Sequence, residues 1–167
     1  MDRKDTTRRI SKALEKHINP RYDTRIYMSK EVTFDYGSLH PIRVDYMLFK
    51  PLNNTISGIE KGDFYCYEIK SCVDDFHSKN GHNFIGDFNY YVMTSDTYDK
   101  IKDEIKYNAY VGVYVLDDSG MLTIIKKAKR TNRQYPLAET LLMMFRSANR
   151  EFIKSLKEQE SKSDGTV

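Results

Sequence analysis

Two charged residues interrupt an apolar run in the middle of the chain. Residues 64–71 read Phe-Tyr-Cys-Tyr-Glu-Ile-Lys-Ser, with Glu68 and Lys70 two positions apart. The run predicts a strand buried on both faces, and alternate residues of a strand share a face, so Glu68 and Lys70 point the same way. Burying a carboxylate and an ammonium is costly unless they pair, bind an ion or line a wet cleft. The pattern therefore requires one of these three explanations.

A second acid lies on the strand expected just upstream. Residues 41–49 read Pro-Ile-Arg-Val-Asp-Tyr-Met-Leu-Phe and place Asp45 inside an apolar run. The segment between the two runs, residues 50–63, is polar and rich in turn-forming residues, which predicts an antiparallel hairpin. In such a hairpin Asp45 can lie beside Glu68. The sequence therefore predicts two carboxylates and one lysine on adjacent strands.

These three side chains suit a hard divalent cation next to a phosphoester. Mg²⁺ prefers oxygen ligands and usually takes one or two carboxylates together with phosphate oxygens of a substrate. Asp45 and Glu68 supply the carboxylates, and the carbonyl of Ile69 can add a further oxygen. Lys70 can orient or help deprotonate the attacking water, or stabilise charge that develops on the phosphate. An inert ion-pair cluster at a strand end stays open as the alternative.

The arrangement resembles the core of the PD-(D/E)xK nuclease superfamily, in which an Asp on one strand precedes a Glu-x-Lys on the next. Further motifs occur in the same order: Arg-Val-Asp, Tyr-Glu-Ile-Lys-Ser, Asp-Phe, Asn-Tyr-Tyr-Val, Pro-Leu-Ala-Glu, and Phe-Arg-Ser-Ala on a helix. Together they are similar to the MmcB-like family of DNA-repair-associated nucleases over residues 6–152. One segment departs from that family, which has a basic residue and a Trp after Asp-Phe, where this chain reads His-Ser-Lys-Asn-Gly-His-Asn.

The resemblance implies a restriction-endonuclease-like fold and a DNA endonuclease that depends on Mg²⁺ or Mn²⁺ and acts in DNA repair. It implies that Asp45, Glu68 and Lys70 are catalytic and that Asp45, Glu68 and Ile69 hold the metal. Two rivals remain. One is a catalytically inactive module of the same fold that binds nucleic acid or a protein partner. The other is a structural or inhibitory protein that uses its 13 tyrosines as an interface.

The first predicted helix offers one more acid. Some families of the superfamily place an additional acidic ligand on this helix, so Glu15 is a candidate metal ligand. Glu31, on the following strand, competes with it for that role. A solvated carboxylate is the alternative for both residues.

Positive charge is local in this sequence. The net charge is only +3, so overall charge does not indicate nucleic acid. Basic residues gather in a loop and recur at i,i+4 intervals on the last helix, surfaces that meet phosphates in nucleic-acid-binding proteins. We expect six residues to contact the DNA backbone: Arg43, Lys127, Lys129, Arg130, Arg146 and Arg150. For the loop, a solvated edge is the alternative.

Periodicity predicts the elements that position these residues. We expect strands at residues 25–35, 41–49, 64–71, 88–94, 109–117 and 121–127, with long helices at 6–18, 96–107 and from 136 onward. The Asp-Ser-Gly at residues 118–120 predicts that the last two strands form a hairpin. The last helix has a predicted buried stripe of Leu137, Leu141, Met144, Phe145, Ala148 and Phe152. The order predicts an α/β fold with a mixed central β-sheet flanked by helices. We expect a single domain over residues 1–157 and a disordered tail at 158–167.

Other features narrow the class of protein. Cys66 and Cys72 lack a CxxC spacing, so we expect free thiols and a cytoplasmic location. His77 and His82 lack i,i+4 spacing and a cysteine pair, which disfavours zinc. No apolar run approaches the roughly 20 residues of a membrane span, and no signal peptide is visible. The sequence leaves a homodimer open.

Overall fold

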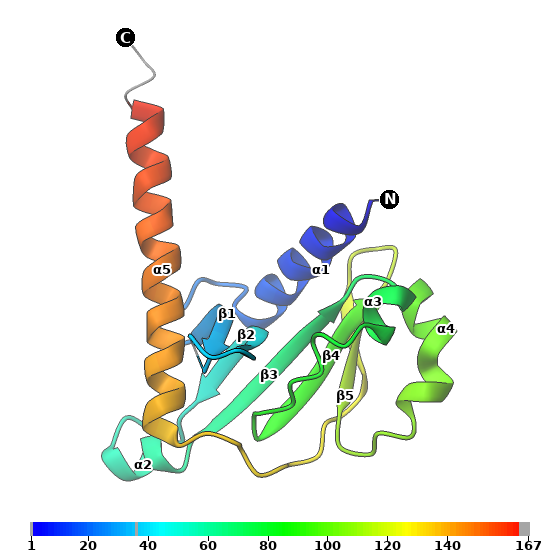
Figure 1. Cartoon of the computed structure of the whole chain (residues 1–167), viewed down its shortest axis with the longest axis horizontal. Helices are drawn as coiled ribbons and strands as arrows, with labels where there is room; N and C mark the ends of the chain where they lie inside the picture. The colour runs from blue at the N-terminus through cyan, green and yellow to red at the C-terminus, as the bar shows by residue number, and fades with distance from the viewer. Residues whose placement is uncertain (1, 36, 164–167) are drawn as a thin grey trace.

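The computed structural model describes residues 2–35 and 37–163. Within them it has the predicted architecture, an α/β protein with a six-stranded mixed sheet and flanking helices (Figure 1). The strands are β1 (Tyr27–Phe34), β2 (Ile42–Lys50), β3 (Asp63–Lys70), β4 (Phe88–Thr94), β5 (Gly112–Leu116) and β6 (Leu122–Lys126). The helices are α1 (Arg3–Ile18), α2 (Ile56–Glu60), α3 (Val73–His77), α4 (Ser95–Ile105) and α5 (Leu137–Ser163).

The strands lie side by side in chain order. β1, β2 and β3 form an antiparallel meander, β3, β4 and β5 run parallel, and β6 returns antiparallel to β5. The predicted hairpins between β2 and β3 and between β5 and β6 are confirmed. The parallel pair β3–β4 needs a crossover, and α3 with the following loop provides it.

The helices cover the two faces of the sheet unequally. On one face Ile10 and Leu14 of α1 pack against the central strands, including Ile69. On the other face α5 packs over β1 and β2 through residues such as Met144, and α4 packs over β4 and β5 through residues such as Ile101. Between these two blocks, on the face that α4 and α5 cover, no long helix of the described residues lies over the C-terminal half of β3. The even-numbered side chains of β3 face this strip.

The secondary structure differs from expectation between β2 and β3 and at the end of the last helix. The segment between β2 and β3 is not only a turn, because it contains α2, whose first turn is capped by the Thr55 hydroxyl accepting from the Gly58 amide. The last helix continues to Ser163, so residues 158–163, which we expected to be disordered, are helical. Glu, Gln and Lys are good helix formers and can extend a helix without an apolar face. Residues 164–167 of that predicted tail lie outside the described part of the chain.

The predicted buried stripe of α5 is wrong in part. Met144 is buried, and Leu137 and Leu141 pack against the core, but Phe145 and Phe152 are 70% and 59% exposed. Helical spacing alone predicts that apolar residues lie on one side of the helix. In the structure α5 has two apolar sides, and β1 covers only one of them.

Two smaller expectations can be compared with the structure. Cys66 is buried and Cys72 is half-buried, and both are free thiols. Among the described residues, none of the helices is both long and apolar enough to span a membrane.

Candidate active-site cleft

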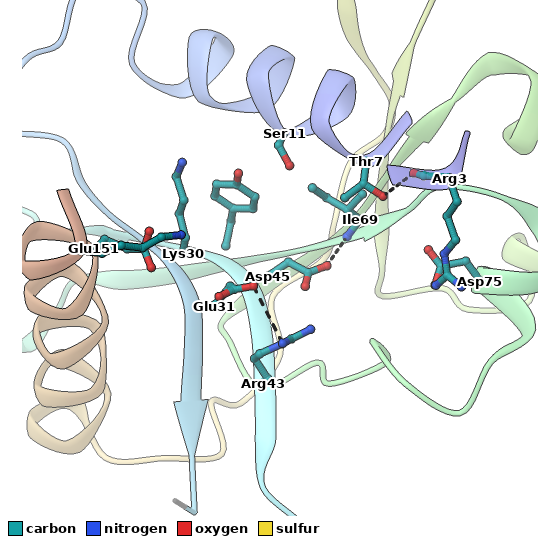
Figure 2. A pocket seen from close by; sticks show the side chains of 12 residues that line it. Arg3, Thr7, Ser11, Lys30, Glu31, Arg43, Asp45, Ile69, Asp75 and Glu151 are labelled. Atoms are coloured by element: carbon teal, nitrogen blue, oxygen red, sulfur yellow. Dashed lines mark hydrogen bonds and ion pairs between the residues drawn. The ribbon is translucent and has the colours of Figure 1, made fainter. Parts of the chain in front are cut away.

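Asp45 lies just beyond the point where the pairing of β2 with β3 ends, and we call this opening between the two strands the fork. The ladder between β2 and β3 ends at the pair Tyr46–Tyr67, one residue short of Asp45. Beyond that point the Asp45 side chain replaces the backbone of β2 as the acceptor, since its Oδ2 takes a hydrogen bond of 2.9 Å from the Ile69 amide (Figure 2). The fork therefore fixes one carboxylate oxygen of Asp45 against the strand that carries Glu68 and Lys70.

Glu68 is a buried acid without a partner for one of its oxygens. Glu68 is 1% exposed, and its Oε1 is the only buried side-chain nitrogen or oxygen in the described chain that lacks a hydrogen bond. Burial, reinforced by the nearby charge of Asp45, raises the pKa of Glu68 to about 9. Burial also raises the pKa of Asp45, against the opposing effect of the Ile69 hydrogen bond. A nearby positive charge would therefore stabilise the ionised form of both carboxylates.

Lys70 is held by backbone carbonyls. Its Nζ donates to the carbonyl oxygens of Asn80 at 2.7 Å and Asp75 at 3.2 Å. Burial lowers the pKa of the Lys70 ammonium, although the neighbouring acids act against that shift. Gly81 follows in the same loop with φ of +70°, and a Cβ there would lie 2.8 Å from Lys70 Nζ and 3.1 Å from Glu68 Oε2. Only glycine fits this close approach without a shift of the neighbouring side chains.

These residues line two adjoining clefts. A cleft of about 640 Å³ has Asp45, Glu68 and Lys70 in its wall, and a second cleft of about 420 Å³ runs between α1 and α5. The clefts share Arg3, Arg43, Asp45, Ile69 and Asp75. Figure 2 shows the second cleft, with Thr7 and Ser11 reaching it from α1 and Glu151 from α5. Asp45 therefore stands where the two clefts meet, and the structure brings the predicted triad together.

One further acid, Asp75, belongs to this neighbourhood and was not predicted as a site residue. Its Oδ2 accepts from the amide and hydroxyl of Ser71, and its Oδ1 pairs with Arg3 at 2.5 Å. The sequence signals were its position four residues after Ser71 and the Asn-Gly turn that follows. Neither signal shows that α3 folds back over the end of β3.

Glu15 does not reach this cleft. Its Oε1 pairs with Lys30 at 2.5 Å and accepts from the Tyr46 hydroxyl at 2.7 Å, and Glu15 is absent from the wall of either cleft. Tyr46 follows Asp45 on β2 and packs against α1, which separates Glu15 from the two carboxylates. Its competitor Glu31 lines the smaller cleft, where it pairs with Arg43 at 3.9 Å and Arg150 at 3.8 Å.

The donor set suits a hard divalent cation. Within residues 2–35 and 37–163 no cluster of three or more His, Cys, Asp or Glu side chains has the geometry of a metal site. Mg²⁺ needs less from the protein, since one or two carboxylates suffice when water and substrate complete its shell. Asp45 and the orphaned Oε1 of Glu68 meet that need. The two histidines disfavoured for zinc have separate partners, Glu104 for His77 and Tyr91 for His82.

The predicted DNA contacts fall into two groups. Arg43 lines both clefts, and Arg146 and Arg150 line a groove along α5 together with Lys154. The predicted contacts Lys127, Lys129 and Arg130 lie elsewhere. Arg130 pairs at 2.7 Å with Asp63 at the start of β3, roughly 20 Å along the strand from Lys70. The loop is therefore at the opposite end of β3 from the carboxylates.

Comparisons with known proteins return no match: no family model, no curated protein and no solved structure is similar to this chain at a significant level.

Proposed function

We propose that this protein is a divalent-metal-dependent phosphodiesterase that cleaves DNA, of the PD-(D/E)xK type that the sequence motifs resemble. One observation carries the proposal. Asp45 is held in the fork between β2 and β3, and beside it Glu68, which lines the same cleft, has a buried oxygen without a hydrogen-bond partner. A carboxylate buried in this way costs stability unless a positive charge compensates it.

The residues have distinct roles in this proposal. Asp45 and Glu68 hold Mg²⁺ or Mn²⁺, and the Ile69 carbonyl is the third protein oxygen. The ion, when bound, lowers the pKa of a water and polarises the phosphoryl group. Lys70, kept close by the Asn80 carbonyl, orients the water or stabilises charge on the scissile phosphate. Arg43 and Arg3 at the junction of the two clefts bind flanking phosphates.

A specific observation favours the rival, a catalytically inactive module of the same fold. Lys70 Nζ already has two carbonyl partners, and Gly81 lies over both Lys70 and Glu68. In a catalytic protein this loop has to leave room for a phosphate, whereas an inactive module can keep it closed. The rival uses the same clefts for binding alone.

Plasmid cleavage separates the two. Supercoiled plasmid is incubated with the wild-type protein and Mg²⁺ or Mn²⁺, and we expect nicked or linear product. Glu68→Gln and Lys70→Ala should each lower the rate by about 100-fold or more. Lys126→Ala is the matched control, because the half-buried Lys126 also donates to backbone carbonyls, at the far end of α4. An uncut plasmid with both metals, or equal cutting by wild type and Lys70→Ala, would refute catalysis at this site.

The choice of DNA over RNA is tested in the same assay. The proposal expects labelled DNA to be cut faster than RNA of the same sequence. Calorimetry with Mn²⁺ alone provides a readout independent of turnover, because heat of binding should be present in the wild type and lost in Glu68→Gln.

A further inference from the structure

The outer side of α5 carries a stripe of exposed apolar side chains at regular intervals. We call Leu142, Phe145, Asn149, Phe152 and Leu156 the outer stripe. The four apolar members are 58%, 70%, 59% and 41% exposed, in chain order. Apolar side chains of this size rarely stand together in water without a partner. The proposed cleavage does not explain the outer stripe.

The outer stripe lies opposite the side of α5 that packs on the sheet. Thr140, Met144 and Ser147 are buried on the inner side, and Ser147 donates to the backbone of β1 at Lys30. At 100° per residue, Asn149 lies about 160° to 180° from Thr140 and Ser147 around the helix axis. The sheet therefore cannot cover the outer stripe. Figure 1 shows α5 continuing well past the end of the sheet.

The spacing of the outer stripe is that of a coiled coil. Its members follow one another at intervals of three, four, three and four residues, which is the a/d pattern of a heptad. Leu142, Asn149 and Leu156 take the a positions, and Phe145 and Phe152 take the d positions. We propose that the outer stripe binds the outer stripe of a second copy of this chain, with the two α5 helices parallel.

Asn149 indicates which partner binds the outer stripe and in which direction the helix of that partner runs. An apolar partner would bury the Asn149 amide without a hydrogen bond, which costs about 1–3 kcal/mol. In a parallel pair of identical helices in register, the same a position of the second copy places its own amide at the same level. A single Asn at an a position is a known device for fixing register and oligomeric state. In an antiparallel pair an a position faces a d position, so Asn149 would meet a phenylalanine.

The surroundings of the outer stripe agree with a second copy. A mainly apolar groove of about 610 Å³ adjoins it, lined by Phe145 and Ala148 of α5 and by Ile26, Tyr27 and Ile59 of the sheet edge and α2. This groove widens the apolar surface that pairing would remove from water. The two sheets would stand on the outsides of the helix pair. Glu151, on the inner side of α5, lines the cleft near Asp45, so pairing leaves that cleft open.

Sedimentation of the full-length chain over a wide concentration range tests the pairing. We expect a monomer–dimer equilibrium for the wild type. Phe145→Glu and Phe152→Glu should each weaken it more than about tenfold, because each places a charge at the centre of the seam. Lys157→Glu, an exposed change on the same helix outside the outer stripe, should leave it unchanged. Far-UV circular dichroism confirms folding, which these exposed positions should not disturb.

A wild-type monomer at every concentration, or a dimer that survives Phe152→Glu, would overturn the proposal and assign the outer stripe to another occupant. Direction is tested by Leu156→Cys in a Cys72→Ser background under mild oxidation. A parallel pair should form a disulfide-linked dimer in high yield, and Cys72→Ser alone should form none. Failure of the pair to cross-link while it still sediments as a dimer would overturn the parallel arrangement. Neither experiment depends on nuclease activity.

Discussion

Asp87 and Glu68 are both buried against β3, at opposite ends of the strand, and their surroundings differ. Asp87 is 4% exposed, and its Oδ2 accepts from the Phe64 amide at 2.9 Å and pairs with Arg133 at 3.2 Å. Glu68 is 1% exposed and leaves one oxygen without any partner. Asp87 thus holds the final loop to the sheet, whereas Glu68 weakens the fold that contains it. The comparison teaches that two equally buried acids can have opposite effects on the stability of the fold, because their partners differ.

The largest effect should come from breaking the satisfied acid. Asp87→Ala removes the acceptor of the Phe64 amide and the carboxylate partner of Arg133, and removing one partner of a buried pair costs about 3–5 kcal/mol. Urea unfolding measures the loss in unfolding free energy. Asp63→Ala, which removes a half-buried partner of the exposed Arg130, is the control and should cost about 1 kcal/mol or less. A loss below about 1 kcal/mol for Asp87→Ala would show that Asp87 is not structural.

Replacing Glu68, the acid with an unpartnered oxygen, should raise the free energy of unfolding instead of lowering it. Folding raises the pKa of Glu68 from 4.5 to about 9, so its protonated form favours the fold. That stability is present below about pH 4.5 and is lost as the pH rises towards about 9. Glu68→Gln is always neutral, so in metal-free buffer its free energy of unfolding should equal that of the wild type near pH 4 and exceed it by several kcal/mol near pH 8.5. Urea unfolding at several pH values measures the difference, with Glu60→Gln on α2 as the exposed control. A variant that is less stable than the wild type at high pH would contradict the comparison.

A divalent ion should supply what Glu68 lacks. At 100 times its dissociation constant, Mn²⁺ should stabilise the wild type by about 2.7 kcal/mol. Glu68→Gln and Asp45→Asn should lose most of that gain, and Glu60→Gln should keep it. Chemical unfolding with and without Mn²⁺ measures the gain. Equal stabilisation of the wild type and both site variants would place any bound ion elsewhere.

The smallest effect concerns the loop over the unsatisfied acid. Gly81 and Gly120 both have positive φ, of +70° and +85°, but a Cβ at Gly120 would meet no atom within 4 Å. Gly120→Ala should therefore cost only the backbone strain, about 1 kcal/mol. Gly81→Ala adds contacts with Lys70 and Glu68, and should cost about 1 kcal/mol more. Equal losses for the two variants would show that the loop moves aside freely.

Much of the fold follows from local sequence because local signals decide it. Residues 88–94 are a strand with the predicted bounds, and the Asp-Ser-Gly turn joins β5 and β6 as expected. The features that the sequence did not predict depend on tertiary contacts or on side-chain capping. Helix α2 relies on a Thr55 cap within a segment rich in turn residues. The outer side of α5 resembles a core side in sequence, and only the position of β1 distinguishes the two.

The site divides in the same way. The pairing of β2 with β3 follows from the hairpin signal, so Asp45, Glu68 and Lys70 could be placed together from sequence. Asp75 could not, because its role depends on how α3 folds back onto Ser71. The Lys127–Arg130 loop was grouped with the cleft on charge alone, and its partner Asp63 lies at the far end of β3.

The fork at Asp45 gives the protein a built-in spectroscopic reporter. The Ile69 amide proton is bonded to the Asp45 carboxylate and not to the backbone of β2, so its chemical shift depends directly on the charge of that carboxylate. One resonance of a ¹⁵N-labelled sample would therefore follow protonation or ion binding at Asp45 without any substitution. The amides of the intact β2–β3 ladder, which ends at the pair Tyr46–Tyr67, should keep their chemical shifts.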